Sequence, residues 1–251
     1  MKQPPNDVND GVKVVAFMNA RQTIFGLIVL AIFLSSLIHP TGAVAVQQGT
    51  HLVLIDPAHG GEDEGVISDK LLEKDLTLHI ALLIQQEAQN KPGFQLQLTR
   101  STDRKMTVAE RVEAARSTKA DCMISLHVNA GFGKKSTGYE VYFPGFQREV
   151  AGDKDSSPII KDMVRNKSMN DSVRLAQQIQ YGLEKVLPRK GRGLRDAPSP
   201  LLDGLTIPSL VIEIGFASHP DDRKKLTEPE IQKAIANAVV KSLQNYFSSL
   251  P

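Results

Sequence analysis

"HLVLIDPAHGGEDEG", residues 51–65, joins an apolar run to a turn that carries a histidine and two adjacent glycines. The run at 51–56 is rich in aliphatic side chains and is followed by turn-forming residues, which predicts a buried β-strand. Proline fixes one backbone dihedral and glycine permits positive values, so the residues after the run predict a sharp turn. Backbone geometry accounts for this turn except for His59, which requires a chemical explanation.

Strand-like runs and longer helical patterns alternate along the rest of the chain. Four further runs predict strands, at residues 94–99, 122–127, 138–143 and 209–215. The spacing of apolar residues predicts helices at 72–84, 107–118 and 171–187, and a last helix that opens near residue 227. This alternation predicts a single α/β domain around a mostly parallel, twisted sheet, without an internal repeat.

The last helix is expected to begin in "TEPE", residues 227–230. Thr227 and Glu230 have the spacing of a capping box, and Pro229 lies in the first turn, where its missing N–H costs nothing. We therefore expect Thr227 to cap this helix.

The composition is that of an ordinary globular protein and gives little support for nucleic-acid binding. The chain has 251 residues, of which 41% are hydrophobic and 23% charged, with a net charge of +2. It has no basic block, 5% aromatic residues and no tryptophan. Nucleic-acid binding is therefore a poor prediction, because the sequence has neither a cluster of basic residues nor many aromatic side chains on which bases could stack.

An apolar segment near the N-terminus predicts export. The run at 24–38 follows Arg21 and is shorter than the roughly 20 residues that span a membrane. The small residues "AVA" at 43–45 match a signal-peptidase site. We predict a signal peptide at 1–45, with Met18 as an alternative start, and a mature domain at 46–251 in the periplasm or cell envelope. A retained membrane anchor is the alternative; cleavage would leave no stable membrane span.

Residues 144–170, "PGFQREVAGDKDSSPIIKDMVRNKSMN", form a stretch that is too long and too polar for a plain connection. Segments of this kind in compact domains are lids, binding loops or solvated insertions. The sequence leaves a functional lid and a solvated insertion both open.

Four residues of catalytic type are predicted to meet at one edge of the sheet. Parallel sheets bind ligands beyond the carboxyl ends of their strands. His59 follows the first strand, His127 ends the third, and Glu213 lies near the end of the last. Glu73 begins the first helix, which starts at that same edge.

Two imidazoles and one carboxylate make a zinc site that keeps a fourth position for water. Zinc lowers the pKa of bound water to about 7, and a separate carboxylate then accepts the proton. Glu213 suits that role because its neighbours in "LVIEIGF" are apolar. Structural readings remain open for each residue: a turn histidine, a first-turn acid, a core histidine and a strand-end acid.

The choice of the carboxylate ligand is open on spacing alone. "HGGE" places Glu62 three residues after His59, an arrangement that fits a zinc metallopeptidase acting on wall peptides. Glu73 is the alternative, and Glu213 remains available as the base in either case. Asn129, two residues after His127, is predicted to point to the same side of its strand and to orient substrate or to serve the turn.

Eight motifs occur in order between residues 51 and 247: "LIDPAHGG", "LLEKDLTLHIA", "LTRSTDR", "ERVEAAR", "ISLHVNA", "GYEVYF", "GRGLRDAP" and "IPSLVIEIGFASHPDD". Together they resemble the zinc-dependent N-acetylmuramoyl-L-alanine amidases of the type 3 family. The resemblance implies a sheet flanked by helices on both faces. It also implies that His59, Glu73 and His127 hold Zn²⁺ and that Glu213 is catalytic.

The implied reaction is hydrolysis of the amide between N-acetylmuramic acid and the L-alanine of the peptidoglycan stem peptide. Some envelope relatives carry, in the place of residues 144–170, a helix that blocks the zinc until an activator protein displaces it. Acids that would reach a metal from this segment are Glu149, Asp153, Asp155 and Asp162. The competing classes are a zinc metallopeptidase and a non-catalytic peptidoglycan-binding protein.

Overall fold

A computed structural model describes residues 50–131, 135–145, 156–188 and 193–250, with the backbone alone for 156–162. All of these described residues belong to one compact unit. The predicted signal peptide at 1–45 lies outside the described residues. Across the part of the chain that is described, no helix is both long and apolar enough to cross a membrane.

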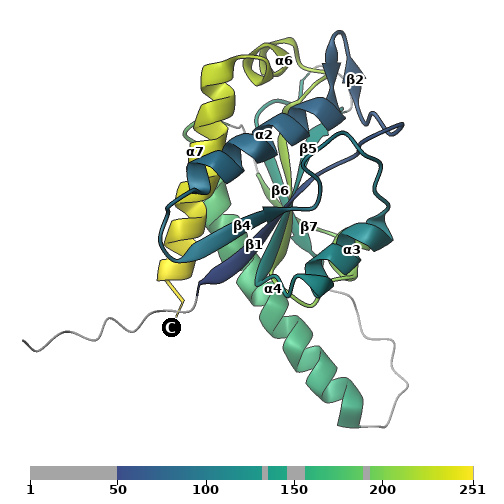
Figure 1. Cartoon of the computed structure of the whole chain (residues 1–251), viewed down its shortest axis with the longest axis vertical. Helices are drawn as coiled ribbons and strands as arrows, with labels where there is room; N and C mark the ends of the chain where they lie inside the picture. Colours follow the sequence, from purple (N-terminus) through teal and green to yellow (C-terminus); the bar gives the residue numbers. More distant parts are fainter. Residues whose placement is uncertain (1–49, 132–134, 146–155, 189–192, 251) are drawn as a thin grey trace, which may run out of the picture. The chain divides into compact units, whose positions relative to one another are not determined.

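A six-stranded sheet in the order β4-β1-β5-β8-β6-β7 organises the domain (Figure 1). Its strands are β1 (His51–Pro57), β4 (Phe94–Leu98), β5 (Cys122–Asn129), β6 (Glu140–Pro144), β7 (Leu194–Ala197) and β8 (Ser209–Phe216). The first four strands in this order are parallel to one another, whereas β6 is antiparallel to β8 and β7 is parallel to β6. The prediction of a mostly parallel sheet is confirmed. A small hairpin of β2 (Ile67–Ser68) and β3 (Leu71–Leu72) precedes the first described helix.

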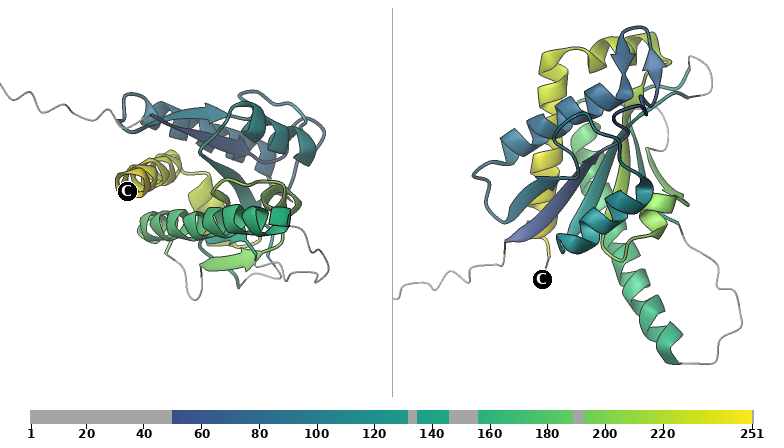
Figure 2. Two further views of the ribbon diagram at one scale, coloured as in Figure 1. Left: turned by 90° about the horizontal axis from the view of Figure 1, so that it is seen from below. Right: turned by 45° about the vertical axis from the view of Figure 1, so that its right-hand side comes forward.

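Helices cover both faces of the sheet (Figures 1 and 2). They are α2 (Glu73–Ala88), α3 (Val108–Ser117), α4 (Ser156–Leu183), α5 (Pro200–Asp203), α6 (Pro220–Leu226) and α7 (Pro229–Ser248). Side chains of β1 alternate between two cores, because successive residues of a strand point to opposite faces. Val53 and Ile55 pack in the larger core with α2, α4 and α7, whereas Leu54 packs in a smaller core with residues of α3 and α5.

Helix α4 begins at Ser156, so the expectation that helix starts only at residue 171 is wrong. Residues 163–167 are exposed on every side of the helix, and burial begins with Ser168 and Met169. Apolar periodicity marks only turns that pack on a core, which is why it missed the exposed ones. Part of the predicted insertion is therefore helix.

The exposed turns of α4 lie beyond the amino edge of the parallel strands. Ser172 accepts a hydrogen bond at Oγ from the backbone N–H of Ser209, the first residue of β8, at 2.9 Å. The turns before Ser172 continue past this edge (Figure 1). Because β6 runs against β8, the chain also reaches residue 144 at this amino edge.

The predicted capping box of α7 is wrong. Its N-cap is Glu228, without a side-chain cap, whereas Thr227 ends α6 and donates from Oγ1 to the carbonyl of Lys224. Pro229 does occupy the first turn. Thr227 is the C-cap of the short helix α6. Local spacing could not show that this residue ends one helix and does not begin the next.

Candidate metal centre

His59 occupies a strained turn directly after β1. Its φ is 60°, in the left-handed region that a residue with a Cβ rarely adopts, and Gly60 and Gly61 follow with φ of 129° and 63°. Such a conformation persists only where surrounding contacts impose it. The turn therefore needs a support, which lies beneath it.

Two buried arginines bind the carbonyl groups of this turn. Arg111 Nη2 donates to the oxygen of His59 at 2.8 Å, and its Nη1 donates to the oxygen of Pro57 at 2.9 Å and to Asp56 Oδ1. Arg100 donates from Nε to the oxygen of Pro57 and from Nη2 to the oxygen of Ala58. Fixed donors on three successive main-chain groups hold the backbone that aims His59.

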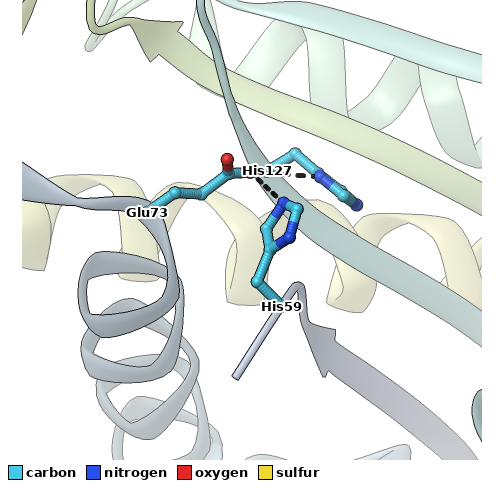
Figure 3. Close-up of side chains that lie close together, drawn as sticks. All are labelled: His59, Glu73 and His127. Atoms are coloured by element: carbon cyan, nitrogen blue, oxygen red, sulfur yellow. Dashed lines mark hydrogen bonds and ion pairs between the residues drawn. The ribbon is translucent and has the colours of Figure 1, made fainter. Parts of the chain in front are cut away.

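Glu73 and His127 meet His59 at the carboxyl edge of the sheet (Figure 3). Glu73 is the first residue of α2, and His127 lies near the end of β5. Glu73 Oε1 is 3.1 Å from His59 Nε2 and 3.1 Å from His127 Nδ1. One ligand atom from each of the three residues lies within 4.8 Å of the others. The structure thus brings the three predicted residues together.

The carboxylate of Glu73 is held firmly at this position. It is 2% exposed, with Oε1 accepting from Val128 N at 2.9 Å and Oε2 from Val66 N at 2.8 Å. Burial by itself raises the pKa of Glu73, but the hydrogen bonds from His127, His59 and Val66 outweigh it and lower that pKa far below its usual range. Glu73 is therefore an ionised acceptor at neutral pH.

The electrostatics of the three residues favour a positive charge between them. The hydrogen bond to Glu73 raises the pKa of His59 against the opposing effect of burial, and Asp63 adds to the rise. Asp63 Oδ1 lies 2.9 Å from His59 Nδ1, which leaves Nε2 as the atom that faces Glu73. A carboxylate behind a histidine is the usual support of a metal-binding imidazole. The donor set fits a zinc ion in its chemistry.

Glu62, the alternative ligand, lies away from this cluster. Its side chain is 90% exposed and its Oε2 is 3.3 Å from Lys105 Nζ. The H-x-x-E spacing therefore does not bring Glu62 to the other two side chains, because the turn after His59 directs it to solvent.

Glu213 is the neighbour of His127 across the sheet. The two residues pair in register between β8 and β5. Glu213 Oε2 is buried and has no hydrogen-bond partner among the described residues. Burial raises the pKa of Glu213 to about 7, with Glu73 and Glu140 adding to the rise and His127 opposing it. Such a carboxyl group exchanges a proton near neutral pH.

Glu140, which sequence reasoning missed, pairs in register with Glu213 from the other side. It is 4% exposed and contacts Tyr142, Asn129 and Arg195. Tyr142 donates its hydroxyl to Oε2 at 2.5 Å, Asn129 Nδ2 donates to Oε2 at 3.2 Å, and Arg195 Nη2 is 3.1 Å from Oε1. The sequence signal that could have identified Glu140 was an acidic residue inside the otherwise apolar strand predicted at 138–143.

Asn129 ends β5, after a register irregularity that follows His127, and its Nδ2 donates to Glu140. Its Oδ1 accepts from Gly131 N at 2.8 Å, so the side chain serves the turn after the strand as well as Glu140. A role in orienting substrate stays a prediction. Glu149, Asp153 and Asp155 lie outside the described residues, as does the side chain of Asp162.

Comparisons with known proteins agree with this geometry. Residues 53–245 match the family model described as N-acetylmuramoyl-L-alanine amidase. The uncharacterized protein YqiI of Bacillus subtilis (strain 168) is 32% identical over 199 residues, which are 78% of this chain and 84% of YqiI.

Solved structures of the same fold carry amidase names. The N-acetylmuramoyl-L-alanine amidase of Clostridium difficile 630 superposes with a TM-score of 0.68 at 26% identity, over 80% of this chain and 99% of that one. The CwlD amidase of Clostridioides difficile, solved in complex with the GerS lipoprotein, superposes with a TM-score of 0.64 at 27% identity, over 79% of this chain and 99% of that one.

Proposed function

This chain belongs to the N-acetylmuramoyl-L-alanine amidase family, and from that membership we propose that it is an exported, zinc-dependent peptidoglycan amidase. Its substrate is the amide that joins the lactyl group of N-acetylmuramic acid to L-alanine of the stem peptide. Hydrolysis detaches stem peptides from glycan strands in the periplasm or cell envelope.

One observation carries the proposal. His59, Glu73 and His127 lie within 4.8 Å of one another, and Glu213, with its raised pKa, is the register neighbour of His127. A structural cluster would pair its buried carboxyl groups with donors, whereas Glu213 Oε2 has no partner in the described part of the chain. An amide hydrolase needs a proton acceptor of this kind beside its electrophilic centre.

His59, Glu73 and His127 would hold the metal. Zinc bound there supplies a positive charge that polarises the scissile carbonyl and lowers the pKa of water. Asp63 keeps the imidazole of His59 in the tautomer whose Nε2 is free to bind. The backbone N–H groups of Val66 and Val128 keep the carboxylate of Glu73 from rotating away.

Glu213 accepts the proton of the attacking water at its unpartnered oxygen. With a pKa near neutral, the protonated carboxyl group then returns that proton to the nitrogen of L-alanine as the amide bond breaks. Burial of this side chain keeps its proton from bulk water during the exchange. The products are a lactyl carboxylate on the glycan and a free amino group on the peptide.

Regulation through residues 144–170 stays a separate hypothesis. A protein activator is consistent with the lipoprotein complex of the CwlD amidase. The described residues on either side of the segment lie at the sheet edge opposite the metal centre. If deleting 146–155 leaves the basal rate unchanged, the autoinhibition hypothesis is wrong.

Digestion of purified peptidoglycan, followed by mass spectrometry of the released material, tests the function. We expect free stem peptides that begin with L-alanine, and none from the Glu213→Gln variant. Shortened stems would show a metallopeptidase instead. Absence of any release by the zinc-loaded protein would show a binding protein.

A further inference from the structure

The metal centre continues across the sheet as a row of polar side chains. Register pairs His127 of β5 with Glu213 of β8, and Glu213 with Glu140 of β6. Arg195 of β7 extends the row by its ion pair with Glu140, at 3.1 Å. Four neighbouring strands thus contribute, in order, an imidazole, a carboxyl group, a carboxylate and a guanidinium to one face.

This face of the sheet is only partly covered. Val141 and Leu194, which alternate with the row, pack into the large core on the opposite side. On the row's own side, His127, Glu213 and Tyr142 are half-buried and the side chain of Arg195 is 49% exposed. A substrate lying across the sheet from the metal centre would meet Arg195 after Glu213.

The guanidinium of Arg195 is positioned by a buried acid. Glu140 is 4% exposed and is itself fixed by Asn129 and by the hydroxyl of Tyr142. A guanidinium carries five N–H donors in a planar fork, and the Glu140 contact involves Nη2. Arginine held in this way matches the geometry of a carboxylate, which it binds through paired hydrogen bonds.

We propose that Arg195 binds a carboxylate of the stem peptide, namely that of the second residue after the scissile amide. The inference rests on the proposed amidase function. Two residues of extended peptide span about 7 Å. Arg195 reaches Glu140 on the strand next to Glu213, and neighbouring strands are about 4.8 Å apart. In a stem whose second residue is a γ-linked D-glutamate, the α-carboxyl group of that residue lies within this reach of the scissile amide. This group is either a free carboxylate or a carboxamide.

Steady-state kinetics on two soluble substrates test the inference with the zinc-loaded protein. The substrates are N-acetylmuramoyl-L-alanyl-D-glutamate with a free α-carboxylate and the same compound with that group amidated. We expect kcat/KM of the wild-type protein to be roughly tenfold higher for the substrate with the free carboxylate. A hydrogen bond between charged groups typically changes binding by about this factor. Arg195→Gln should raise KM for the free carboxylate by roughly the same factor, with kcat little changed and the amidated substrate unaffected.

Matched variants separate substrate binding from a structural ion pair. Arg174→Gln removes another surface arginine, which pairs with Asp171 on α4 and should leave both substrates unaffected. Arg195→Lys, which keeps the charge, should retain part of the preference. Equal rates on both substrates, or an equal loss on both in Arg195→Gln, would overturn the role of Arg195 while the amidase function stands. Cleavage of neither substrate by the wild-type protein would overturn both.

Discussion

Arg111 donates a hydrogen bond from Nη2 to the main-chain oxygen of His59 at 2.8 Å, from beneath the turn that aims this histidine. The same guanidinium pairs with Asp56, which also accepts hydrogen bonds from Thr99 and Ser125. Asp56 and Ser125 are fully buried, and Arg111 and Thr99 are 5% and 7% exposed. The buried ion pair of Arg111 and Asp56 lies beneath the turn at His59, and it therefore links the stability of the domain to the geometry of the candidate metal centre.

Replacing Arg111 by methionine should destabilise the protein by about 3–5 kcal/mol, because it leaves the buried charge of Asp56 without its partner. The left-handed turn at His59 would also lose a support, so zinc affinity should fall. Urea unfolding and a competitive zinc titration measure the two effects. Arg116→Met is the control on the same helix, since Arg116 is exposed and donates to the oxygen of Gly204 at 3.0 Å, away from the turn at His59. Equal effects of the two variants would contradict the role of Arg111.

Glu73→Ala should abolish stoichiometric zinc binding, since Glu73 supplies the only carboxylate within 4.8 Å of both imidazole ligand atoms in the described residues. Glu62→Ala should retain the metal, because Glu62 is 90% exposed and faces Lys105. Metal analysis after gel filtration in a zinc buffer measures both. Retained zinc in Glu73→Ala together with lost zinc in Glu62→Ala would reverse the ligand assignment and favour the metallopeptidase.

Gly65→Ala should impair zinc binding without removing any ligand. An added Cβ at Gly65 would lie 2.5 Å from His59 Cδ2 and 2.6 Å from Glu73 Oε2, so these two side chains would have to separate. Gly93→Ala is the control, because Gly93 also has positive φ but meets no atom within 4 Å. Both variants carry backbone strain, and only the first should lower zinc affinity in the same titration.

Glu213→Gln should lower kcat by roughly 10²–10⁴-fold, the usual effect of losing a general base, because an amide accepts no proton at neutral pH. Zinc content should be unchanged, since Glu213 is not among the three clustered ligand residues. Metal analysis and the rate of L-alanyl peptide release are measured on one preparation. A rate within a few fold of the wild type would exclude Glu213 as the base.

The pH dependence follows from the raised pKa of Glu213. The pKa of the metal-free Glu213 side chain is about 7 against its ordinary value of 4.5, because the side chain is buried, and a bound dication lowers this pKa. The acid limb of kcat/KM should therefore fall between these values, with activity rising as the base ionises. In metal-free protein the folded state disfavours the charged form, so Glu213 lowers stability increasingly as the pH rises from 4.5 to about 7. Thermal unfolding should show that Glu213→Gln gains stability over the wild type across this range; a constant difference would contradict the shift.

Much of the fold follows from local pattern. Apolar runs and helical spacing identified five of the strands of the main sheet, the helices α2, α3 and α7, and the buried part of α4, because burial imposes a period on the sequence. The short helices α5 and α6 were not predicted. The parallel topology then predicted that His59, His127 and Glu213 would meet, since parallel strands end at one edge. The exposed turns of α4 and the strand β7 lacked such a pattern, because neither is fully buried.

The sequence by itself determined the α/β class and the edge of the sheet where the polar residues gather, because both depend on periodicity and chain order. Only the tertiary structure decided which acid joins the histidines. The hairpin of β2 and β3 folds the chain back, so that Val66 N binds Glu73 while Glu62 faces solvent. It likewise decided that Glu140 lies beside Glu213 and pairs with Arg195. Contacts between distant strands depend on register and packing, which no local spacing encodes.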